Sequence, residues 1–400
     1  MTQSMKTIEL GTAHITQKGI DYIQKVLKSG RITYGTYSER LEQLFARLHG
    51  SRFAVLSNSG TSSLQVAVHA LKLLKKWNDG DEILVPSTTF VASVNVILQN
   101  GLVPRFVDVD PQHYDINPDK ITAAITSRTR AIMVVHQFGQ PANMSRIFPI
   151  AKKHALSIIE DSCETMFAQH QGRTVGSWGD VACFSMYTAH LVTTGVGGIA
   201  TTNNHKLALL MKSLCNHGRD NLYLSIDDDA DTNARSFAFI LKNRFKFRHI
   251  GYSYRITELE AALGLAQLES YTDIIKPRQR NAAYLTKHLA FLHDFFQLPS
   301  QRNGSDHVYM VYPIVITDKR IKRDHLLLFL EKRGIETRYL LPLINQPAYR
   351  FLHIKVKDYP VSARLNRNGF YIGCHQKLTI RDLDYVITAF HDYLKQQKLS

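Results

Sequence analysis

The N-terminal half of the chain alternates short apolar segments with longer segments of helical periodicity. The apolar segments are predicted strands: Phe53–Leu56, Ile83–Val85, Pro104–Asp108, Thr129–His136, Leu156–Asp161 and Asp180–Phe184. The segments between them are predicted helices, for example residues 60–74 and 144–154. Alternation of this kind is typical of a mostly parallel sheet with helices on both faces, so the sequence predicts an α/β fold.

Small and polar residues follow the predicted strands, where ligands bind on such sheets. The run Ser59-Gly-Thr-Ser62 joins the first strand to a helix, and Phe90, Asp161 and Ser185 follow later strands. A strand–glycine–helix junction presents free N–H groups and a helix dipole to an anion. Taken alone, this junction is explained as well by a plain helix cap. The convergence of these residues on one edge of the sheet predicts a ligand site there.

A glycine-rich turn follows the strand that ends at Ser185. It contains His190 and the run Gly195-Val-Gly-Gly198, and it leads into another β-like segment, Ile199–Thr202. Glycine has no Cβ, so the backbone N–H groups of such a turn can approach a phosphate closely. We expect the side chain of His190 to point back over the turn.

The C-terminal part is predicted to form a smaller α/β domain. Its segments include helices at residues 258–269 and 278–292, a strand at residues 308–316 and a final helix at residues 380–394. We place the boundary near Tyr254, which gives domains of residues 1–253 and 254–400. Before the boundary, the acidic run Asp227–Asp231 lacks the glycine and terminal glutamate of a calcium loop, so it is interpreted as a solvated surface loop.

Composition limits the classes of protein to which the chain can belong. It has 400 residues, 44% of them hydrophobic and 21% charged, as in soluble enzymes of two domains. The net charge of +15 is spread over short basic groups, which suits a solvated surface or an anionic small substrate better than a nucleic acid. No apolar run reaches about 18 residues and no leader segment is evident, so we expect no membrane contact and a cytoplasmic location.

The four cysteines lie far apart and form no Cys-x-x-Cys pair. This spacing argues against a zinc site and against an iron–sulfur cluster, and it favours buried free thiols. No metal site is predicted.

Several motifs together resemble the DegT/StrS-type sugar aminotransferases, a group of fold-type-I pyridoxal phosphate enzymes. They are Ser59–Ser62, Thr89–Ala92, Glu160–Asp161, Phe184–Ser185 with its glycine-rich turn, and Gly251–Arg255. The resemblance spans nearly the whole chain. It implies an aspartate aminotransferase-like fold, with a large mostly parallel-sheet domain and a smaller C-terminal α/β domain.

The resemblance also implies roles for individual residues. Phe90 corresponds to the aromatic residue that stacks on the pyridine ring, and Asp161 to the acid that keeps the pyridinium nitrogen protonated. The positions that hold the cofactor phosphate are Gly60, Thr61, Ser62 and Ser185. Taken singly, Phe90 reads as a core residue and Asp161 as a helix cap, but their order and shared sheet edge favour a cofactor site.

Three positions depart from the family pattern. Glu164 stands where the family has Gln or His near the phenolic oxygen of the cofactor, and Val196 where many relatives have Glu. Ser253 stands where the family has an Asn that reaches the phosphate in the neighbouring subunit. Family members share each site between two chains, so we expect a homodimer in which Gly251–Arg255 crosses to the partner.

His190 occupies the place of the lysine that forms the Schiff base with the cofactor. Imidazole cannot form a stable imine, so the resemblance implies pyridoxal or pyridoxamine phosphate held non-covalently. Imidazole can still act as a general base near neutral pH. The family branch that dehydrates GDP-4-keto-6-deoxymannose at C3 has the same histidine and takes its amino group from glutamate. Related iron–sulfur dehydratases also have it, but they need clustered cysteines.

Three hypotheses follow. The first is a 3-dehydratase of a nucleotide-linked 4-keto-6-deoxyhexose with His190 as the base. The second is a nucleotide-sugar aminotransferase that uses glutamate without the lysine. The third is a catalytically silent protein that binds the cofactor or the nucleotide sugar. The first two predict cofactor turnover with glutamate and differ in the sugar product, whereas the third predicts no turnover.

Overall fold

The computed structural model describes residues 7–219, 245–341 and 343–399. The acidic run Asp227–Asp231, interpreted above as a surface loop, lies outside these ranges.

The large unit is built on a seven-stranded sheet in the order β1-β9-β8-β5-β4-β2-β3. The strands are β1 (Phe53–Ser57), β2 (Glu82–Pro86), β3 (Val103–Val107), β4 (Thr129–Val135), β5 (Ser157–Asp161), β8 (Val181–Ser185) and β9 (Gly198–Thr202). All pairings from β8 through β5, β4 and β2 to β3 are parallel. β9 lies antiparallel between β8 and β1, and its first residue, Gly198, pairs with both Ser185 and Ser57. The predicted mostly parallel sheet is confirmed.

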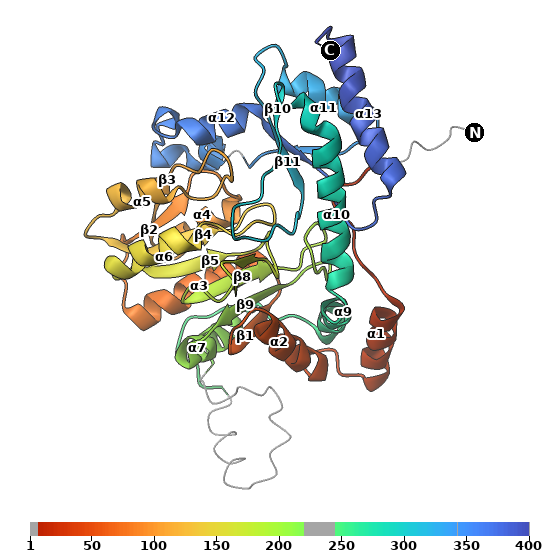
Figure 1. The fold of residues 1–400 in the computed structure, drawn as a ribbon. Helices are drawn as coiled ribbons and strands as arrows, with labels where there is room; N and C mark the ends of the chain where they lie inside the picture. The colour runs from red at the N-terminus through yellow and green to blue at the C-terminus, as the bar shows by residue number, and fades with distance from the viewer. Residues whose placement is uncertain (1–6, 220–244, 342, 400) are drawn as a thin grey trace.

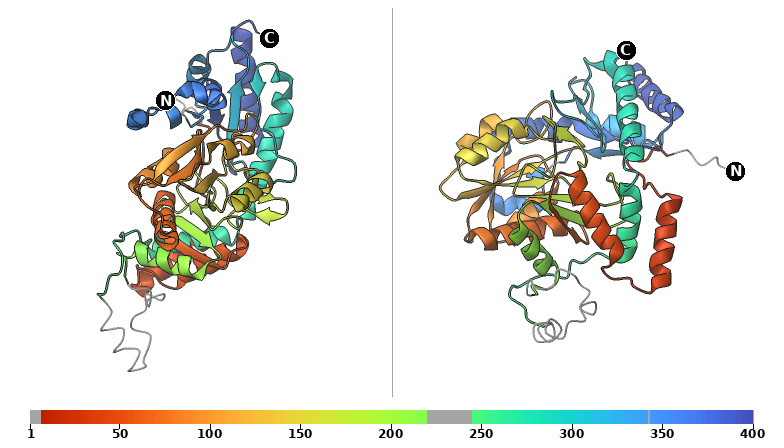
Figure 2. Two further views of the ribbon diagram at one scale, coloured as in Figure 1. Left: turned by 90° about the vertical axis from the view of Figure 1, so that its left-hand side faces the viewer. Right: turned by 60° about the horizontal axis from the view of Figure 1, so that its bottom comes forward.

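Helices cover both faces of this sheet, as Figures 1 and 2 show. One face packs against α3 (Gly60–Lys75), α4 (Val91–Gln99) and α7 (His205–Cys215), and the other against α2 (Thr36–Leu48), α5 (Pro118–Ala124), α6 (Met144–Lys153) and α9 (Glu258–Leu268). Successive strand residues alternate between the two cores, for example Ile132 and Met133 of β4. Because both faces are buried, the middle residues of the central strands are apolar, for example Ile132 and Met133 in β4 and Ile158 and Ile159 in β5.

The small unit contains a four-stranded antiparallel sheet in the order β10-β11-β13-β12. Its strands are β10 (Phe296–Gln297), β11 (Tyr312–Ile316), β12 (Thr337–Tyr339) and β13 (Gly369–Ile372), and its helices are α11 (Arg323–Glu331), α12 (Pro360–Asn368) and α13 (Ile380–Gln396). Helix α10 (Thr272–Leu289) runs along both units in Figure 1. It begins six residues before the predicted start at Arg278 and continues through Pro277.

The boundary near Tyr254 stays a prediction. Helix α9, which follows it, packs against α2 and against α1 (Gln17–Ser29) beside the large sheet. A capping box of Thr257 and Glu260 starts α9 at Glu258, which agrees with the start predicted for this helix.

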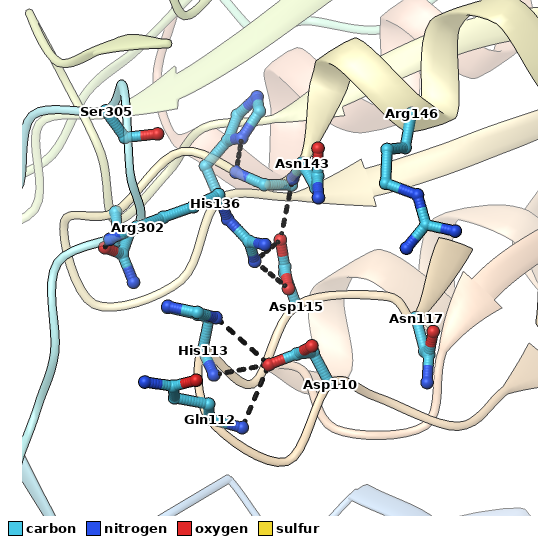
Figure 3. A network of polar contacts seen from close by, with 12 residues as sticks. Asp110, Gln112, His113, Asp115, Asn117, His136, Asn143, Arg146, Arg302 and Ser305 are labelled. Carbon is cyan, nitrogen blue, oxygen red and sulfur yellow. Dashed lines mark hydrogen bonds and ion pairs between the residues drawn. The ribbon is translucent and has the colours of Figure 1, made fainter. Parts of the chain in front are cut away.

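Polar contacts join the segment before β11 to the loops at the carboxyl end of the large sheet (Figure 3). Arg302 donates from Nη2 to both carboxylate oxygens of Asp115, at 2.8 and 2.9 Å. The backbone N–H of Arg302 donates to Gln140 Oε1 at 2.8 Å. Burial raises the pKa of Asp115 although Arg302 opposes the shift. These contacts fix one side of the small unit against the sheet edge where the candidate site lies.

Candidate functional site

The first turn of α3 lies directly against the end of β8. A Cβ at Gly60 would lie 2.6 Å from Ser185 Cβ and 2.9 Å from Cys163 Sγ, closer than side-chain atoms approach. Only glycine lets the helix start at this distance from the strand. The structure therefore brings Gly60 and Ser185, two predicted site residues, into direct contact.

The same turn carries several hydrogen-bonding groups. Ser59 caps the helix by accepting from the N–H of Ser62 at 3.0 Å, and the Ser62 hydroxyl donates to Asn58 Oδ1 at 2.6 Å. The N–H groups of Gly60 and Thr61 have no intrahelical acceptor. Thr61 is exposed. Two free N–H groups, nearby hydroxyls and the positive end of α3 suit an anion such as a phosphate.

Asp161 ends β5 and is 5% exposed. Its Oδ2 accepts from the Ser93 hydroxyl at 2.7 Å, and its Oδ1 accepts from the N–H of Cys163 at 3.2 Å. A turn, not a helix, follows β5, so this carboxylate does not cap a helix. Two hydrogen bonds thus orient a buried carboxylate near the first turn of α3.

Phe90 precedes α4 and is 58% exposed. A phenylalanine of the core would be buried, so the core interpretation of this residue is wrong. Its exposed ring can stack on a planar ligand at this edge.

Glu164 is partly buried, and its Oε2 accepts from the N–H of Phe138 at 2.9 Å. Burial raises the pKa of Glu164 to about 7, and the charge of Asp161 adds to the shift. Near neutral pH this side chain exists in both protonation states, so it can donate or accept a hydrogen bond.

His190 lies in the turn that follows β8. Its N–H donates to the carbonyl of Tyr187 at 2.9 Å, which fixes the backbone. Its Nδ1 is enclosed and has no hydrogen-bond partner among the described residues. Burial lowers the pKa of His190 to about 4, and the charge of Arg278 adds to the shift, while a backbone bond with Ser185 opposes it. The imidazole is therefore neutral at physiological pH and has a nitrogen available.

Ser253 is not part of this cluster within one chain. It is exposed, and its hydroxyl accepts from Arg255 Nη2 at 3.0 Å. The neighbouring Tyr254 carbonyl accepts from the N–H of Asn58, one residue before the cap of α3. The segment is thus anchored beside the site while Ser253 itself faces outward.

Three further residues of the site were not predicted from the sequence. Ser93 orients Asp161, and Gln267 and Arg278 contact the turn that carries His190. Ser93 sits in an apolar helix, and its spacing from Thr89 could have indicated a polar pair. Gln267 lies in the helix predicted at residues 258–269, but its contact with the turn could not be predicted, and no pattern marks Arg278. Both side chains are buried by segments far away in the chain.

The described residues contain no helix long and apolar enough to cross a membrane. Across the same residues, no three His, Cys, Asp or Glu side chains are grouped as metal ligands. All four cysteines are free thiols: Cys183, Cys215 and Cys374 are buried and Cys163 is partly buried.

Residues 13–391 match the DegT/DnrJ/EryC1/StrS aminotransferase family. The chain belongs to this family. It is 34% identical over 380 residues to the dTDP-4-dehydro-2,6-dideoxy-D-glucose 3-dehydratase of Saccharopolyspora spinosa, covering 91% of this chain and 81% of that protein. It is 32% identical over 377 residues to the GDP-perosamine synthase of Caulobacter vibrioides, covering 94% and 95% of the two chains.

A solved structure of E. coli GDP-4-keto-6-deoxy-D-mannose-3-dehydratase with bound hydrated PLP superposes with a TM-score of 0.87. The two chains are 25% identical, and the match covers 97% of this chain and 100% of the other. Family membership and this likeness confirm the predicted fold and the predicted cofactor, pyridoxal phosphate. The chain is a nucleotide-sugar enzyme of deoxy- and aminosugar biosynthesis that depends on this cofactor.

Proposed function

We propose that the chain is a 3-dehydratase of a nucleotide-linked 4-keto-6-deoxyhexose that binds its cofactor non-covalently and uses His190 as the base. The observation that supports this is the environment of His190: a neutral imidazole with an unpartnered nitrogen stands where the family has lysine. An imidazole cannot become covalently attached to pyridoxal phosphate as an imine, but it can take up a proton.

The side chains at the sheet edge fit the cofactor. The contact of Gly60 with Ser185 leaves the first turn of α3 open to a phosphate, with Thr61 and Ser62 beside it. The exposed ring of Phe90 offers a stacking face. Asp161, oriented by two hydrogen bonds, offers a carboxylate to a protonated ring nitrogen. When bound, the cofactor supplies an electron sink for the carbon that loses its proton.

The remaining chemistry belongs to residues of this chain. His190 takes the proton from the cofactor carbon C4′, while Asp161 holds its charge at the ring nitrogen. A lysine would carry that proton on to C4 of the sugar, but the imidazole is shorter and its backbone is fixed at Tyr187 and Arg278. Proton delivery to C4 is thereby slowed, and expulsion of the C3 hydroxyl competes better.

Glu164 lies three residues after Asp161 and is held by the N–H of Phe138. We place it near the phenolic oxygen of the cofactor. With its raised pKa of about 7, it can donate a hydrogen bond there, as the Gln or His of relatives does.

A nucleotide-sugar aminotransferase is the alternative. It is favoured by the 32% identity to a GDP-perosamine synthase over nearly the whole of both chains. The two functions share the cofactor, glutamate and a keto sugar, and they differ in the product. A dehydratase expels the C3 hydroxyl and releases ammonia, whereas an aminotransferase keeps that hydroxyl and leaves an amino group on C4.

Product analysis distinguishes these functions. Purified protein, pyridoxal phosphate and glutamate are incubated with GDP-4-keto-6-deoxymannose and with the corresponding dTDP-linked sugar, followed by mass spectrometry. We expect a sugar without its C3 hydroxyl, together with ammonia. A 4-amino sugar that keeps the C3 hydroxyl would establish the aminotransferase, and no cofactor turnover with either sugar would indicate a silent binding protein.

Borohydride reduction tests the non-covalent cofactor separately. The reduced protein should gain no cofactor-sized mass on any peptide. A stoichiometric adduct on a lysine would contradict the proposed use of His190.

We further propose a homodimer in which Gly251–Arg255 reaches the site of the partner. The outward-facing Ser253 and Arg255, anchored through Tyr254 to Asn58, support this arrangement. Light scattering should give twice the chain mass at micromolar concentration, and an active monomer would contradict it.

A further inference from the structure

Two buried polar side chains contact the turn at residues 186–197. The first is Gln267 of α9, which is 0% exposed. Its Oε1 accepts from the N–H of Thr193 at 3.0 Å, and its Nε2 donates to the carbonyl of the same residue. The Gln267 amide therefore pairs with both backbone groups of Thr193, as a neighbouring strand would, and so holds the second half of the turn.

The second is Arg278 of α10, the largest fully buried side chain. It donates from Nη1 to the carbonyls of Met310 at 2.7 Å and Tyr309 at 3.3 Å, and from Nε to Gln376 Oε1 at 3.1 Å. Its Nη2 donates to the carbonyl of His190 at 3.4 Å. None of these four acceptors is a carboxylate. Burying a charge without a counter-charge is unfavourable, so this guanidinium requires another explanation.

The N-terminal segment lies behind the same part of the turn. A Cβ at Gly11 would lie 3.0 Å from the carbonyl oxygen of Ala189, which shows how closely the two backbones approach. The adjacent Thr12 carbonyl accepts from Gln376 Nε2 at 2.9 Å, and Gln376 is also a partner of Arg278. Arg278 thus sits where the N-terminal segment, the small unit and the His190 turn meet.

We propose that Arg278 is a positioning residue for His190, which holds the carbonyl of His190 against the small unit and so fixes where the imidazole stands. This inference rests on the proposed function, in which His190 is the base. A rigid planar fork of five donors can hold carbonyls that lie on different sides of it, whereas a lysine offers three donors on a single nitrogen.

The charge of Arg278 also favours the neutral form of the His190 imidazole. It adds to the burial that lowers the pKa of His190. The groups that face the imidazole are Arg278, the Ser185 backbone and Tyr187, whose ring centroid lies 5.9 Å away, and none is acidic. On its other side Arg278 faces Cys374 and His375.

The variants are Arg278→Met, which removes the fork and the charge, and Arg278→Lys, which keeps only the charge. Gln267→Met is the matched control, because it releases the other half of the turn without changing any charge. His190→Asn identifies the His190 signal among the 18 histidines by its absence.

The first measurement is an NMR pH titration of the His190 imidazole in cofactor-free protein. In Arg278→Met its pKa should rise toward the ordinary value of about 6.5, and its chemical shift should move. In Gln267→Met and Arg278→Lys the pKa should stay low. A titration of Arg278→Met that matches the unaltered protein would overturn the proposal, whether or not any sugar is turned over.

The second measurement is turnover of the nucleotide sugar. For Arg278→Met we expect kcat to fall at least tenfold while the KM for the sugar changes less than threefold, and for Arg278→Lys a smaller loss. A purely structural brace would lower the melting temperature and leave kcat per folded molecule unchanged. If Arg278→Met does not fold, Arg278→Lys tests the proposal. In that variant, an unchanged chemical shift of His190 together with an unchanged kcat would contradict it.

Discussion

His136 and His190 both follow strands at the carboxyl edge of the large sheet, but their environments differ. His136 is 0% exposed and both of its nitrogens are used: Nδ1 accepts from the N–H of Ala142 at 2.9 Å, so Nε2 carries the proton and donates to Glu160 at 3.0 Å. His190 has an enclosed Nδ1 without a partner. A buried histidine with both nitrogens bonded stabilises the fold, whereas one with a free nitrogen is available for proton transfer.

The partners of the two histidines differ as well. Glu160 also accepts from the N–H groups of Gly176, Trp178 and Gly179 at 2.7 to 2.9 Å. The His136–Glu160 pair therefore organises the loop at residues 176–179. The charge that acts on the His190 imidazole is instead that of the cation Arg278, which favours the neutral form.

Replacing His190 should have the largest effect on catalysis. Loss of a general base typically lowers a rate by about 10²–10⁴, so His190→Asn should lose C3 deoxygenation by that factor. Since the variant keeps Asp161 and Ser185, it should still bind the cofactor. Ammonia release and the cofactor absorbance spectrum measure the two effects. A rate within tenfold of the unaltered protein would show that His190 is not the base, so that neither histidine would have a catalytic role.

Replacing His136 should affect stability instead. His136→Leu leaves the N–H of Ala142 unpaired and removes one partner of the buried Glu160, so the free energy of unfolding should fall by about 3 kcal/mol. Urea unfolding measures this loss. We expect kcat per folded molecule to stay within threefold, and a specific loss of kcat at unchanged stability would show that His136 takes part in the reaction.

Acid should destabilise the protein through its buried neutral histidines. Burial lowers the pKa of His190 and His49 to about 4 and that of His307 to about 3. Between these values and the unfolded value near 6.5, the unfolded chain binds more protons, so stability falls as the pH falls through this window. Glu164, with a folded pKa of about 7, acts in the opposite direction between about 4.5 and 7.

Denaturant midpoints measured from pH 7.5 to 5 test how much His190 contributes to the loss of stability in acid. His190→Asn should show a shallower loss of stability than the unaltered protein, by about 2 kcal/mol at pH 5. His136→Leu lowers the whole curve and serves as the control. Identical slopes for His190→Asn and the unaltered protein would mean that His190 is not buried in its neutral form.

The smallest effect is expected at Phe90, which extends the comparison from histidines to aromatic residues. Its ring is exposed, whereas that of Phe184 in β8 is 0% exposed. Phe90→Leu should leave the melting temperature unchanged and weaken cofactor binding about three- to tenfold, because a stacking contact is worth about 0.5–1.5 kcal/mol. Fluorescence titration with pyridoxal phosphate measures the affinity. A lowered melting temperature at unchanged affinity would assign Phe90 to the core.

Local patterns predicted most of the large sheet. The cap of α3, the acid at the end of β5 and the turn after β8 are encoded in short segments, because each depends on neighbouring residues and on the direction of one strand. The free nitrogen of His190 could not be predicted. The groups that contact the backbone of its turn include Gly11 and Arg278, which lie 179 residues before it and 88 residues after it in the chain.

The small unit was predicted less well for a similar reason. β11 begins at Tyr312, four residues later than expected, because Val308 and Met310 instead hydrogen-bond to the loop at residues 138–139. Helix α12 and strand β13 of the small unit were not predicted, and in the large unit helix α7 was not predicted either. β13 is short, and it becomes a strand through its pairing with both β11 and β12.

The position of Gly198 has a consequence for how this site can change during evolution. Gly198 pairs with Ser185, where the turn begins, and with Ser57, beside the first turn of α3. A Cβ at this position would lie 2.1 Å from the carbonyl of Ser59. Adding or deleting a residue within 186–197 would therefore displace the proposed anion-binding turn together with the proposed base. Exchanging the side chain at 190 disturbs neither, so a single codon can alter the chemistry of this enzyme while the framework that binds the cofactor is inherited unchanged.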